Sequence, residues 1–305
     1  MSNYLDMFKN DTSTFIKAVE GPDNKKVAEA AGLFIAEKLR ERSFARQILT
    51  PRTVTRYDLK NHVDHDQLVF VDEKEVNVGP AKAINFKAEP DNVYVKTPRY
   101  EIPIFEIASP IYSKKEIELL ASTQPVTKVI EENVVREIEA TEDSFFLKYA
   151  DAAATAASNT LTVNGTGQKL TKTATKALIN LIESKKLRCS TILMGITTFN
   201  DLLEFDYSDF GSDMLKEVTV NGYTYKDWLG RKLIVSIKDD MFRDGSSNPT
   251  IYGFADEKAL GRFLVLDSTK FGVQKKFQTI EFGAWEYIGI GIGNNSAVSR
   301  ISLAA

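Results

Sequence analysis

The sequence predicts an α+β protein that is organised around one long helix. Residues 126–157 carry an apolar stripe at steps of three and four residues, with no proline or glycine to interrupt it. Short β-favouring runs dominate residues 48–107 and most of the chain after residue 204. Helices and strands do not alternate as they do in a parallel βαβ series, and no internal repeat is visible.

Composition limits the kinds of function that the chain can have. With 305 residues, 43% of them hydrophobic, the chain can bury a large core, in two domains or in one domain with long excursions. The 39 basic and 42 acidic residues give a formal net charge of -3. A nucleic-acid-binding domain normally has a basic excess, so the chain is not expected to neutralise phosphates one by one.

Cysteine usage and hydropathy indicate the compartment. Cys189 is the only cysteine, so no intrachain disulfide can form and a reducing environment is expected. We expect Cys189 to be a small packed residue, since the only histidines, His62 and His65, are far away in the sequence. The N-terminus has no apolar signal core, and no segment holds eighteen consecutive apolar residues. The sequence therefore predicts a soluble protein that is made in the cytoplasm.

A helix is expected near the N-terminus. Gly21-Pro22 is a strong break, and Asp23 or Asn24 can cap a helix that begins there. Pro51 prevents this helix from continuing far past Gln47. Its apolar face repeats at steps of three and four residues: Val27, Ala31, Phe34, Ile35 and Leu39.

Residues 48–107 predict strands that lack a dense core of their own. The β-favouring runs are 67–71, 76–78 and 93–96, and Gly79-Pro80 and residues 89–92 separate them. An isolated strand pair is only marginally stable in water, so this pattern indicates a surface on a partner chain. An ordinary β-subdomain that the rest of the chain covers is an equally open interpretation.

The long helix is the clearest local prediction. At about 1.5 Å per residue, it would form a rod of roughly 45–50 Å. A coiled coil competes, but the steps do not keep a strict heptad. The predicted buried stripe consists of Val126, Ile130, Val134, Ile138, Thr141, Phe145, Tyr149 and Ala152. The charged residues that lie off it are expected to meet solvent: Glu131, Glu132, Glu137, Glu139, Asp143 and Lys148.

The remaining chain predicts a mixture of shorter elements. Residues 164–167, with two glycines, are expected to form a hairpin tip. Helices are predicted over 173–186 and 198–204, with a strand over 191–194 between them. Further strands are predicted over 217–220, 233–237, 250–253, 262–266, 271–274 and 279–290.

No motif argues for catalysis. The loop 165–171 resembles a phosphate loop, but it lacks the Gly-Lys-Ser/Thr ending and a preceding predicted strand. The run from His62 to Asp66 offers possible metal ligands from one segment only, so a solvated loop is the more economical interpretation. No Gly-x-Ser-x-Gly elbow exists for a serine nucleophile. Glu142 and Asp143 are adjacent on the helix and point in different directions, which favours a solvated face over a catalytic pair.

Four motifs follow one another along the chain: Tyr100–Pro110, Glu142–Phe146, Trp228–Ser236 and Phe282–Ile292 with the following Asn294–Val298. Taken in this order, they resemble the tailed-bacteriophage major capsid family with the Hong Kong phage-capsid fold. The resemblance implies an N-terminal arm and helix (1–46), an extended β-hairpin called the E-loop with flanking strands (47–105), a P-domain (106–189) with a spine helix (125–157), an A-domain (190–265), and return strands with a C-terminal tail (266–305).

The same resemblance implies a structural role and no cofactor. The subunit would form pentamers and hexamers that close into an icosahedral shell around double-stranded DNA, made in the bacterial host and ending in the virion capsid. A separate scaffolding protein is expected as a partner, because residues 1–46 are too short for a cleaved scaffolding segment. A portal is expected as well, and the presence of a decoration protein is left open. The E-loop residues expected to contact neighbouring subunits are Leu68, Phe70, Val76, Val78, Ile84 and Phe86.

Two alternatives and one chemical question stay open. An encapsulin-like shell shares the fold but encloses cargo proteins, and an enzyme or ligand-binding protein would have an unrelated fold. Some relatives join lysine to asparagine between subunits. Lys74, Lys82, Lys87 and Asn295 are available here, but no catalytic carboxylate can be assigned, so this chemistry is not carried over.

Overall fold

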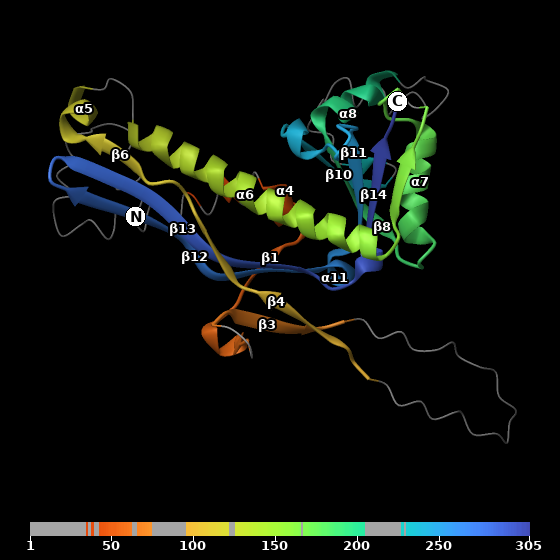
Figure 1. Cartoon of the computed structure of the whole chain (residues 1–305), viewed down its shortest axis with the longest axis horizontal. Coiled ribbons are helices and arrows are strands. Elements are labelled where there is room, and N and C mark those ends of the chain that lie inside the picture. Colours follow the sequence, from red (N-terminus) through yellow and green to blue (C-terminus); the bar gives the residue numbers. More distant parts are fainter. Residues whose placement is uncertain are drawn as a thin grey trace, which may run out of the picture.

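The computed structural model describes residues 35, 38–39, 43–62, 66–74, 96–121, 126–165, 167–204, 227–228 and 230–305. In Figure 1, a long helix lies along a long two-stranded ribbon, with a larger sheet at one end and a small sheet beside the ribbon. Several predictions fall outside the described residues: the strands over 76–78 and 217–220, most of the run 93–96, and most of the N-terminal helix.

The ribbon is an antiparallel hairpin of β12 (Gly261–Lys276) and β13 (Thr279–Ile292), called the long hairpin below. The sequence prediction divided β12 into two strands, over 262–266 and 271–274, and this division is wrong. The ladder shifts register around Asp267 and then continues, so a polar bulge interrupts the apolar pattern without ending the strand. Short strands extend the sheet: β1 (Pro51–Thr53) pairs with β12, and β5 (Phe105–Ala108) and β6 (Tyr112–Lys115) pair with β13.

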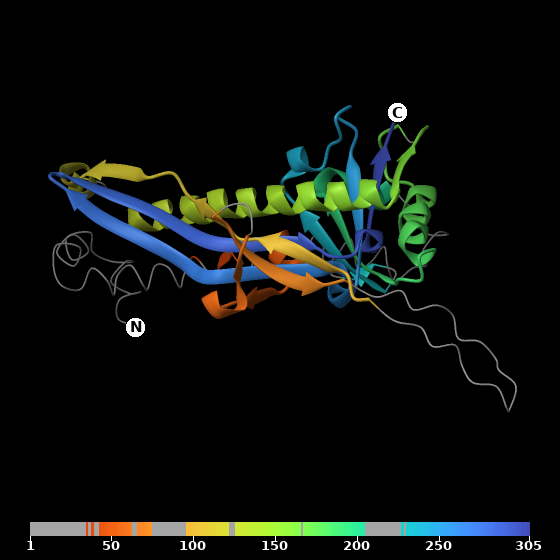
Figure 2. The ribbon, with the colours of Figure 1, turned by 60° about the horizontal axis from the view of Figure 1, so that its bottom comes forward.

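The predicted long helix is confirmed as α6 (Val126–Ala156), which lies along one face of the long hairpin (Figure 2). Ile130, Val134 and Ile138 are buried as the stripe predicts. The second half of the stripe is wrong, because Ala152 is exposed and the buried residues there are Phe146, Ala150 and Ala153. The prediction for the charged positions is partly wrong, because Glu131, Glu139 and Asp143 are buried as well. The reason is that α6 packs against β13, against β14 (Val298–Leu303) and against the short helix α4 (Phe44–Ile48), so more than one of its faces is covered.

A six-stranded sheet stands at the far end of α6, with the order β7-β14-β11-β8-β10-β9 in the described residues. The bounds not yet given are β7 Thr160–Val163, β8 Cys189–Gly195, β9 Asp227–Trp228, β10 Arg231–Ser236 and β11 Thr250–Ala255. The helices α7 (Lys172–Glu183) and α8 (Ile196–Asn200) pack against it. The sheet draws β7 from the predicted P-domain and β14 from the predicted tail.

The pairing of β7 corrects two expectations about the loop that follows it. Strand β7 runs parallel to β14, which comes from the end of the chain, so residues 164–167 are not a hairpin tip. The loop also has a strand before it, which the sequence analysis did not predict. Gly165 and Gly167 adopt positive φ angles of 74° and 61°, and Thr171 then caps α7. The loop is a turn from a strand into a helix.

The N-terminal helix does not continue unbroken to Gln47. Ser43 is extended (φ -66°, ψ 121°), and its hydroxyl accepts a hydrogen bond from the backbone N–H of Arg46, which caps α4. Ile35 and Leu39, two members of the predicted apolar face, are buried in the main core. Ile35 and Leu39, together with α4, therefore contribute to the core of their own subunit.

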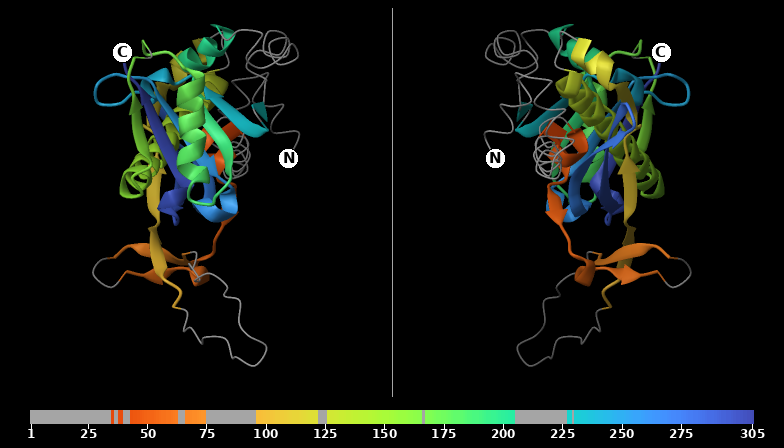
Figure 3. Two further views of the ribbon diagram at one scale, coloured as in Figure 1. Left: turned by 90° about the vertical axis from the view of Figure 1, so that its right-hand side faces the viewer. Right: turned by 90° about the vertical axis from the view of Figure 1, so that its left-hand side faces the viewer.

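The small sheet beside the ribbon has the order β2-β3-β4 and is called the E-loop base. It consists of β2 (Lys60–Asn61), β3 (Leu68–Glu73) and β4 (Arg99–Pro103). Figure 3 shows it projecting from the body. The remaining described helices are short: Arg56–Asp58, Glu116–Ala121, Asp201–Glu204, Asp239–Met241, Glu257–Leu260 and Asn295–Ala297. Within the described ranges, no helix has the length and apolar character that a membrane span requires.

Candidate assembly site at the base of the E-loop

The E-loop base is held together by two antiparallel ladders, a short one between β2 and β3 and a longer one between β3 and β4. Strand β3 pairs with β4 from Val69 with Pro103 to Glu73 with Arg99, and the backbone N–H of Lys74 donates to the carbonyl of Pro98 at 2.8 Å. In this register Phe70 lies opposite Ile102, and Asp72 lies opposite Tyr100. Directly opposed residues share a face of the sheet. Leu68, Phe70 and Asp72 therefore share a face with Ile104, Ile102 and Tyr100.

That face rests on three glycines of the long hairpin. A Cβ atom added to Gly289 would lie 2.7 Å from Cδ1 of Ile104, and one added to Gly291 would lie 2.5 Å from Cγ1 of Ile102. A Cβ atom at Gly293, just past the end of β13, would lie 2.7 Å from the Tyr100 hydroxyl oxygen. These separations are too short for real carbon contacts. We call Gly289, Gly291 and Gly293 the glycine seat.

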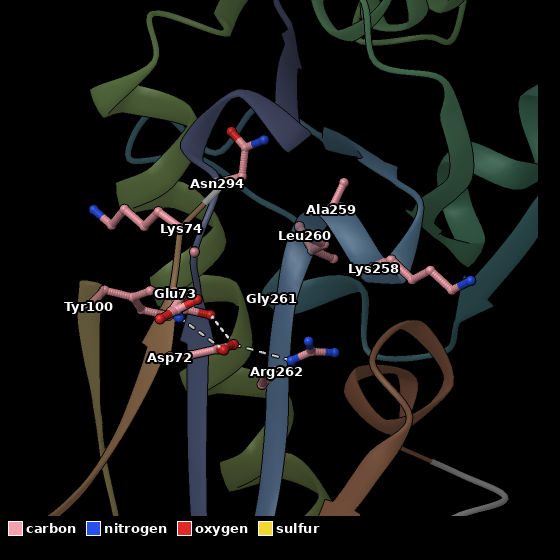
Figure 4. A pocket seen from close by; sticks show the side chains of 11 residues that line it. Asp72, Glu73, Lys74, Tyr100, Lys258, Ala259, Leu260, Gly261, Arg262 and Asn294 are labelled. Carbon is pink, nitrogen blue, oxygen red and sulfur yellow. Dashed lines mark hydrogen bonds and ion pairs between the residues drawn. The ribbon is translucent and has the colours of Figure 1, made fainter. Parts of the chain in front are cut away.

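Asp72 joins the E-loop base to the long hairpin at the end of the seat. Its Oδ2 accepts hydrogen bonds from the Tyr100 hydroxyl and from Nε of Arg262, each at 3.2 Å. Figure 4 shows the three residues converging from β3, β4 and β12. Burial and the neighbouring Asp72 carboxylate raise the pKa of Tyr100, so its hydroxyl keeps its proton and remains a donor.

An open recess of about 400 Å³ adjoins this contact. It includes Lys74 and Lys258, which Figure 4 shows pointing away from each other. Asn294 lines the recess as well, whereas the neighbouring Asn295 named in the sequence analysis does not. The two lysines therefore do not converge on one position for a small ligand.

Two of the predicted intersubunit residues lie in the E-loop base. Leu68 and Phe70 are half-buried and pack on a small cluster of their own chain, made of Val54, Ile102, Ile104 and Leu264. Their side chains thus contribute to seating the base on its own subunit. The other four predicted residues, Val76, Val78, Ile84 and Phe86, lie outside the described residues. A contact of these six residues with a neighbouring subunit stays a prediction.

A second site lies inside the molecule, where the sequence analysis expected a solvated face. The guanidinium of Arg46 binds Glu142 through Nε (2.9 Å) and Nη2 (2.5 Å), and Nη2 also binds both carboxylate oxygens of Glu286 (3.1 and 2.9 Å). The side chains of Glu142 and Glu286 are fully buried, and the Thr269 hydroxyl donates to Glu286 at 3.0 Å. We call this group the Arg46 junction. The expected solvated face is therefore wrong for Glu142.

Asp143 extends the junction toward the six-stranded sheet. Its Oδ1 accepts from the Ser43 hydroxyl at 2.9 Å and from the backbone N–H of Ala45 at 3.1 Å, which holds α4 on α6. Lys238, which follows β10, contacts Asp143 at 2.8 Å and Glu139 at 2.9 Å. Burial raises the pKa of Asp143, and these partners oppose the rise. The junction thus ties the N-terminal segment, α6, the long hairpin and the six-stranded sheet together.

The tip of the long hairpin exposes apolar side chains. Phe277 is 91% exposed and stands in a two-residue turn at φ 55°, a backbone region that disfavours a bulky residue. Ile117 is 74% exposed and lies close by, because the backbone N–H of Glu116 donates to the carbonyl of Gln278. Neither the exposure nor the backbone angle of Phe277 stabilises the isolated subunit, so this tip is a candidate contact surface.

The candidate chemistry of the sequence analysis finds no site among the described residues. No cluster of three or more His, Cys, Asp and Glu side chains there is arranged to hold a metal ion. Nε2 of His62 lies 3.5 Å from Glu101, and residues 63–65 lie outside the described ranges. Cys189 is buried as expected, and burial raises the pKa of its thiol to about 11, so it is not a reactive thiolate at neutral pH.

Comparisons with known proteins find likeness in structure and not in sequence. No protein-family model matches the chain, and no curated protein matches it. A chain of Microbacterium phage Oxtober96 aligns with a TM-score of 0.58 at 11% identity, covering 86% of this chain and 91% of that one. A chain of Mycobacterium phage Adephagia gives 0.59 at 11%, covering 87% and 91%. A chain from the capsid of a native GTA particle gives 0.54 at 14%, also covering 87% and 91%. These alignments confirm the predicted Hong Kong phage-capsid fold.

Sequence reasoning missed the glycine seat and the Arg46 junction. One signal for the seat was present: Gly289, Gly291 and Gly293 alternate within a β-favouring run, and glycine in a strand marks the close approach of another chain segment. No comparable signal marked Arg46, whose partners lie 96 and 240 residues away in the sequence.

Proposed function

We propose that this chain is the major structural subunit of a capsid shell, assembling as pentamers and hexamers into an icosahedral particle around double-stranded DNA. The observation that carries the proposal is the fold likeness over nearly the whole chain to chains from capsid particles. Besides the GTA capsid, a chain from the capsid of Myoviridae phage XM1 aligns with a TM-score of 0.50 at 10% identity, covering 78% of this chain and 86% of that one.

Two features of the subunit support assembly through several modest contacts. The E-loop base is anchored on its own body through β3 and β4, and on this proposal the E-loop residues between Lys74 and Lys96 contact a neighbouring subunit. The tip of the long hairpin presents Phe277 and Ile117 to a second set of neighbours. Each contact needs to be only moderate, because many symmetric copies act together in a closed shell.

The charge of the chain fits enclosure of DNA better than specific binding of it. A net charge of -3 gives packaged DNA no general electrostatic attraction to the subunit. On this proposal, the six-stranded sheet lies at the centre of each pentamer or hexamer, and the hairpin tip lies at the joints between them. A separate scaffolding protein and a portal are proposed partners, and the virion capsid is the proposed location.

The first test is the assembly state of the purified protein. Negative-stain electron microscopy should show shells, tubes or separate pentamers and hexamers, and analytical ultracentrifugation should show the matching large species. A clean monomer at high concentration, with or without crowding agents, would contradict the proposal.

The second test removes the distal E-loop while keeping its base. Residues 75–95 are replaced by Asn-Gly, so that a four-residue loop of Asn, Gly, Lys96 and Thr97 closes the ladder that ends at the bond between Lys74 and Pro98. We expect the variant to keep its circular dichroism spectrum and cooperative unfolding, since β3 and β4 keep their contacts, but to lose assembly. A variant that assembles as well as the wild type would exclude the E-loop as an intersubunit arm.

A further inference from the structure

Two motifs that the sequence analysis considered separately meet in the structure. Tyr100, Ile102 and Ile104 belong to the strand that leads out of the E-loop, and Gly289, Gly291 and Gly293 belong to the closing strand. We propose that the glycine seat, locked by Asp72, fixes the direction in which the E-loop leaves the subunit and thereby the angle between neighbouring subunits. This inference rests on the proposed function and assigns positioning residues to it.

The first step of the argument is steric. Each of the three glycines meets a different side chain of β4 or its extension, and both series advance by two residues. Alternate residues of a strand share one face, so one face of β13 has no side chains at these positions. The opposite face carries Ile288 and Ile290, which are buried in the main core. The absence of Cβ atoms therefore lets β4 approach β13 on the E-loop side alone.

The second step concerns what the seat does not restrain. Glycines offer no side chains to interlock with Ile102 and Ile104, so the seat limits the separation of the two strands more than their relative angle. The Asp72 contact supplies the missing restraint, because it joins Tyr100 of β4 and Arg262 of β12 to one carboxylate. Asp72 also belongs to β3, so the contact includes both strands from which the E-loop leaves.

The third step links the seat to assembly. The β3–β4 ladder is continuous up to Lys74 and Pro98, so a rotation of the base carries both ends of the E-loop with it. A change of angle at the seat would therefore displace whatever the E-loop contacts on a neighbour. Gly291 is the position where added bulk meets Ile102 most closely, which makes it the residue to change.

The experiment measures the direction of the E-loop base in unassembled subunits. Spin labels are attached at Asp66→Cys in the exposed turn before β3 and at Lys276→Cys near the hairpin tip, and pulsed electron paramagnetic resonance gives the distance between them. The native Cys189 is buried and should remain unlabelled. In Gly291→Ala we expect a shifted distance distribution, and assembly reactions that give misshapen or open particles.

The chain offers a matched control and a rescue. Gly283→Ala makes the same change on the same face of β13, but there the new Cβ would meet only Cγ1 of Ile111 at an ordinary 3.8 Å. The distance between the spin labels and the shape of the particles should therefore stay unchanged. Adding Ile102→Ala to Gly291→Ala removes the side chain that the new methyl group meets. The double variant should recover most of the wild-type distance and particle shape.

A further variant keeps the inference testable if Gly291→Ala fails to fold. Asp72→Ala removes a partly exposed contact, so the subunit should fold, and its distance distribution should broaden. Unchanged distributions in the folded Gly291→Ala or Asp72→Ala variants would overturn the inference. If the wild type forms no shells at all, the proposed function fails, whereas the label distances still decide whether the seat sets the direction.

Discussion

The Arg46 junction and the E-loop base hold parts of the same subunit together in opposite ways. The junction is made of charged side chains that are almost completely buried and that join segments far apart in the sequence. The base rests on its body through a small apolar cluster, three glycines and one partly exposed carboxylate. The comparison indicates a body that is locked by buried charges and an arm whose direction is set by only a few contacts.

The physical difference lies in what a small displacement costs. A buried charge that loses its partner keeps its desolvation penalty, so the junction tolerates little movement. The apolar contact at the base depends on area and not on direction, and its polar contact is partly screened by water. In a shell subunit of the proposed kind, the body would tolerate few changes, whereas a change at any of the few contacts of the base would alter the direction of the arm.

The largest expected effect comes from Arg46→Ala. It leaves Glu142 and Glu286 buried without their guanidinium, and removing one partner of a buried pair typically costs about 3–5 kcal/mol. Urea unfolding of the variant should show a strongly lowered midpoint or no folded state. The matched control is Arg300→Ala, whose ion pair with Asp151 is partly exposed and should contribute about 1 kcal/mol or less. Equal effects from the two variants would contradict the central role of the junction.

A smaller effect is expected at the E-loop base from Ile102→Ala. Ile102 is fully buried, but its buried cluster has only four members and the side chains packed around it are partly exposed, so the loss of stability should be about 2 kcal/mol, near the lower end for such substitutions. The same urea measurement gives the value. Ile237→Ala is the control, because Ile237 is 83% exposed and its truncation should change stability by less than about 0.5 kcal/mol. A loss at Ile102 as large as that at Arg46 would remove the contrast between the two regions.

The third expected effect concerns pH. Two carboxyl groups, Glu142 and Glu286, face one guanidinium, and burial together with Glu286 raises the pKa of Glu142 well above its ordinary value of 4.5. The folded chain therefore binds this proton more tightly than the unfolded chain. The resulting stability is complete below the unfolded pKa and is lost as pH rises through the folded pKa, by at most about 1.4 kcal/mol per pH unit for one proton.

Glu142→Gln tests this pH dependence. Gln has no proton to lose, so the free energy of unfolding of the variant should fall less than that of the wild type as pH rises from 5 to 8. The free energy of unfolding of the variant should still fall somewhat with pH, because burial also raises the pKa of Asp143, and its charged neighbour Lys238 opposes that rise. Measurements begin at pH 5 because Asp58 and Asp244 have lowered pKa values, and the stability that they contribute is lost only in more acidic solution. Parallel profiles for variant and wild type would show that Glu142 does not hold a proton in the folded state.

The elements that sequence reasoning placed correctly are those with local periodicity. The apolar stripe of α6 repeats every three to four residues without a breaker, and the alternation along β13 shows one covered face. Strand β14 escaped prediction, although it is buried between β7 and β11. Its position in the six-stranded sheet depends on segments more than forty residues away, which no local window contains.

The sequence by itself determined the α+β class, the long helix and the family-like order of motifs, because spacing along the chain directly reflects which faces must be covered. Only the tertiary structure decided that Glu142 is buried, that Leu68 and Phe70 face their own subunit, and that Gly291 receives Ile102. The physical reason is that neighbouring groups in space decide both whether a charged side chain is buried and whether a position requires glycine. That approaching group comes from another part of the chain, and its distance in the sequence carries no information about the contact.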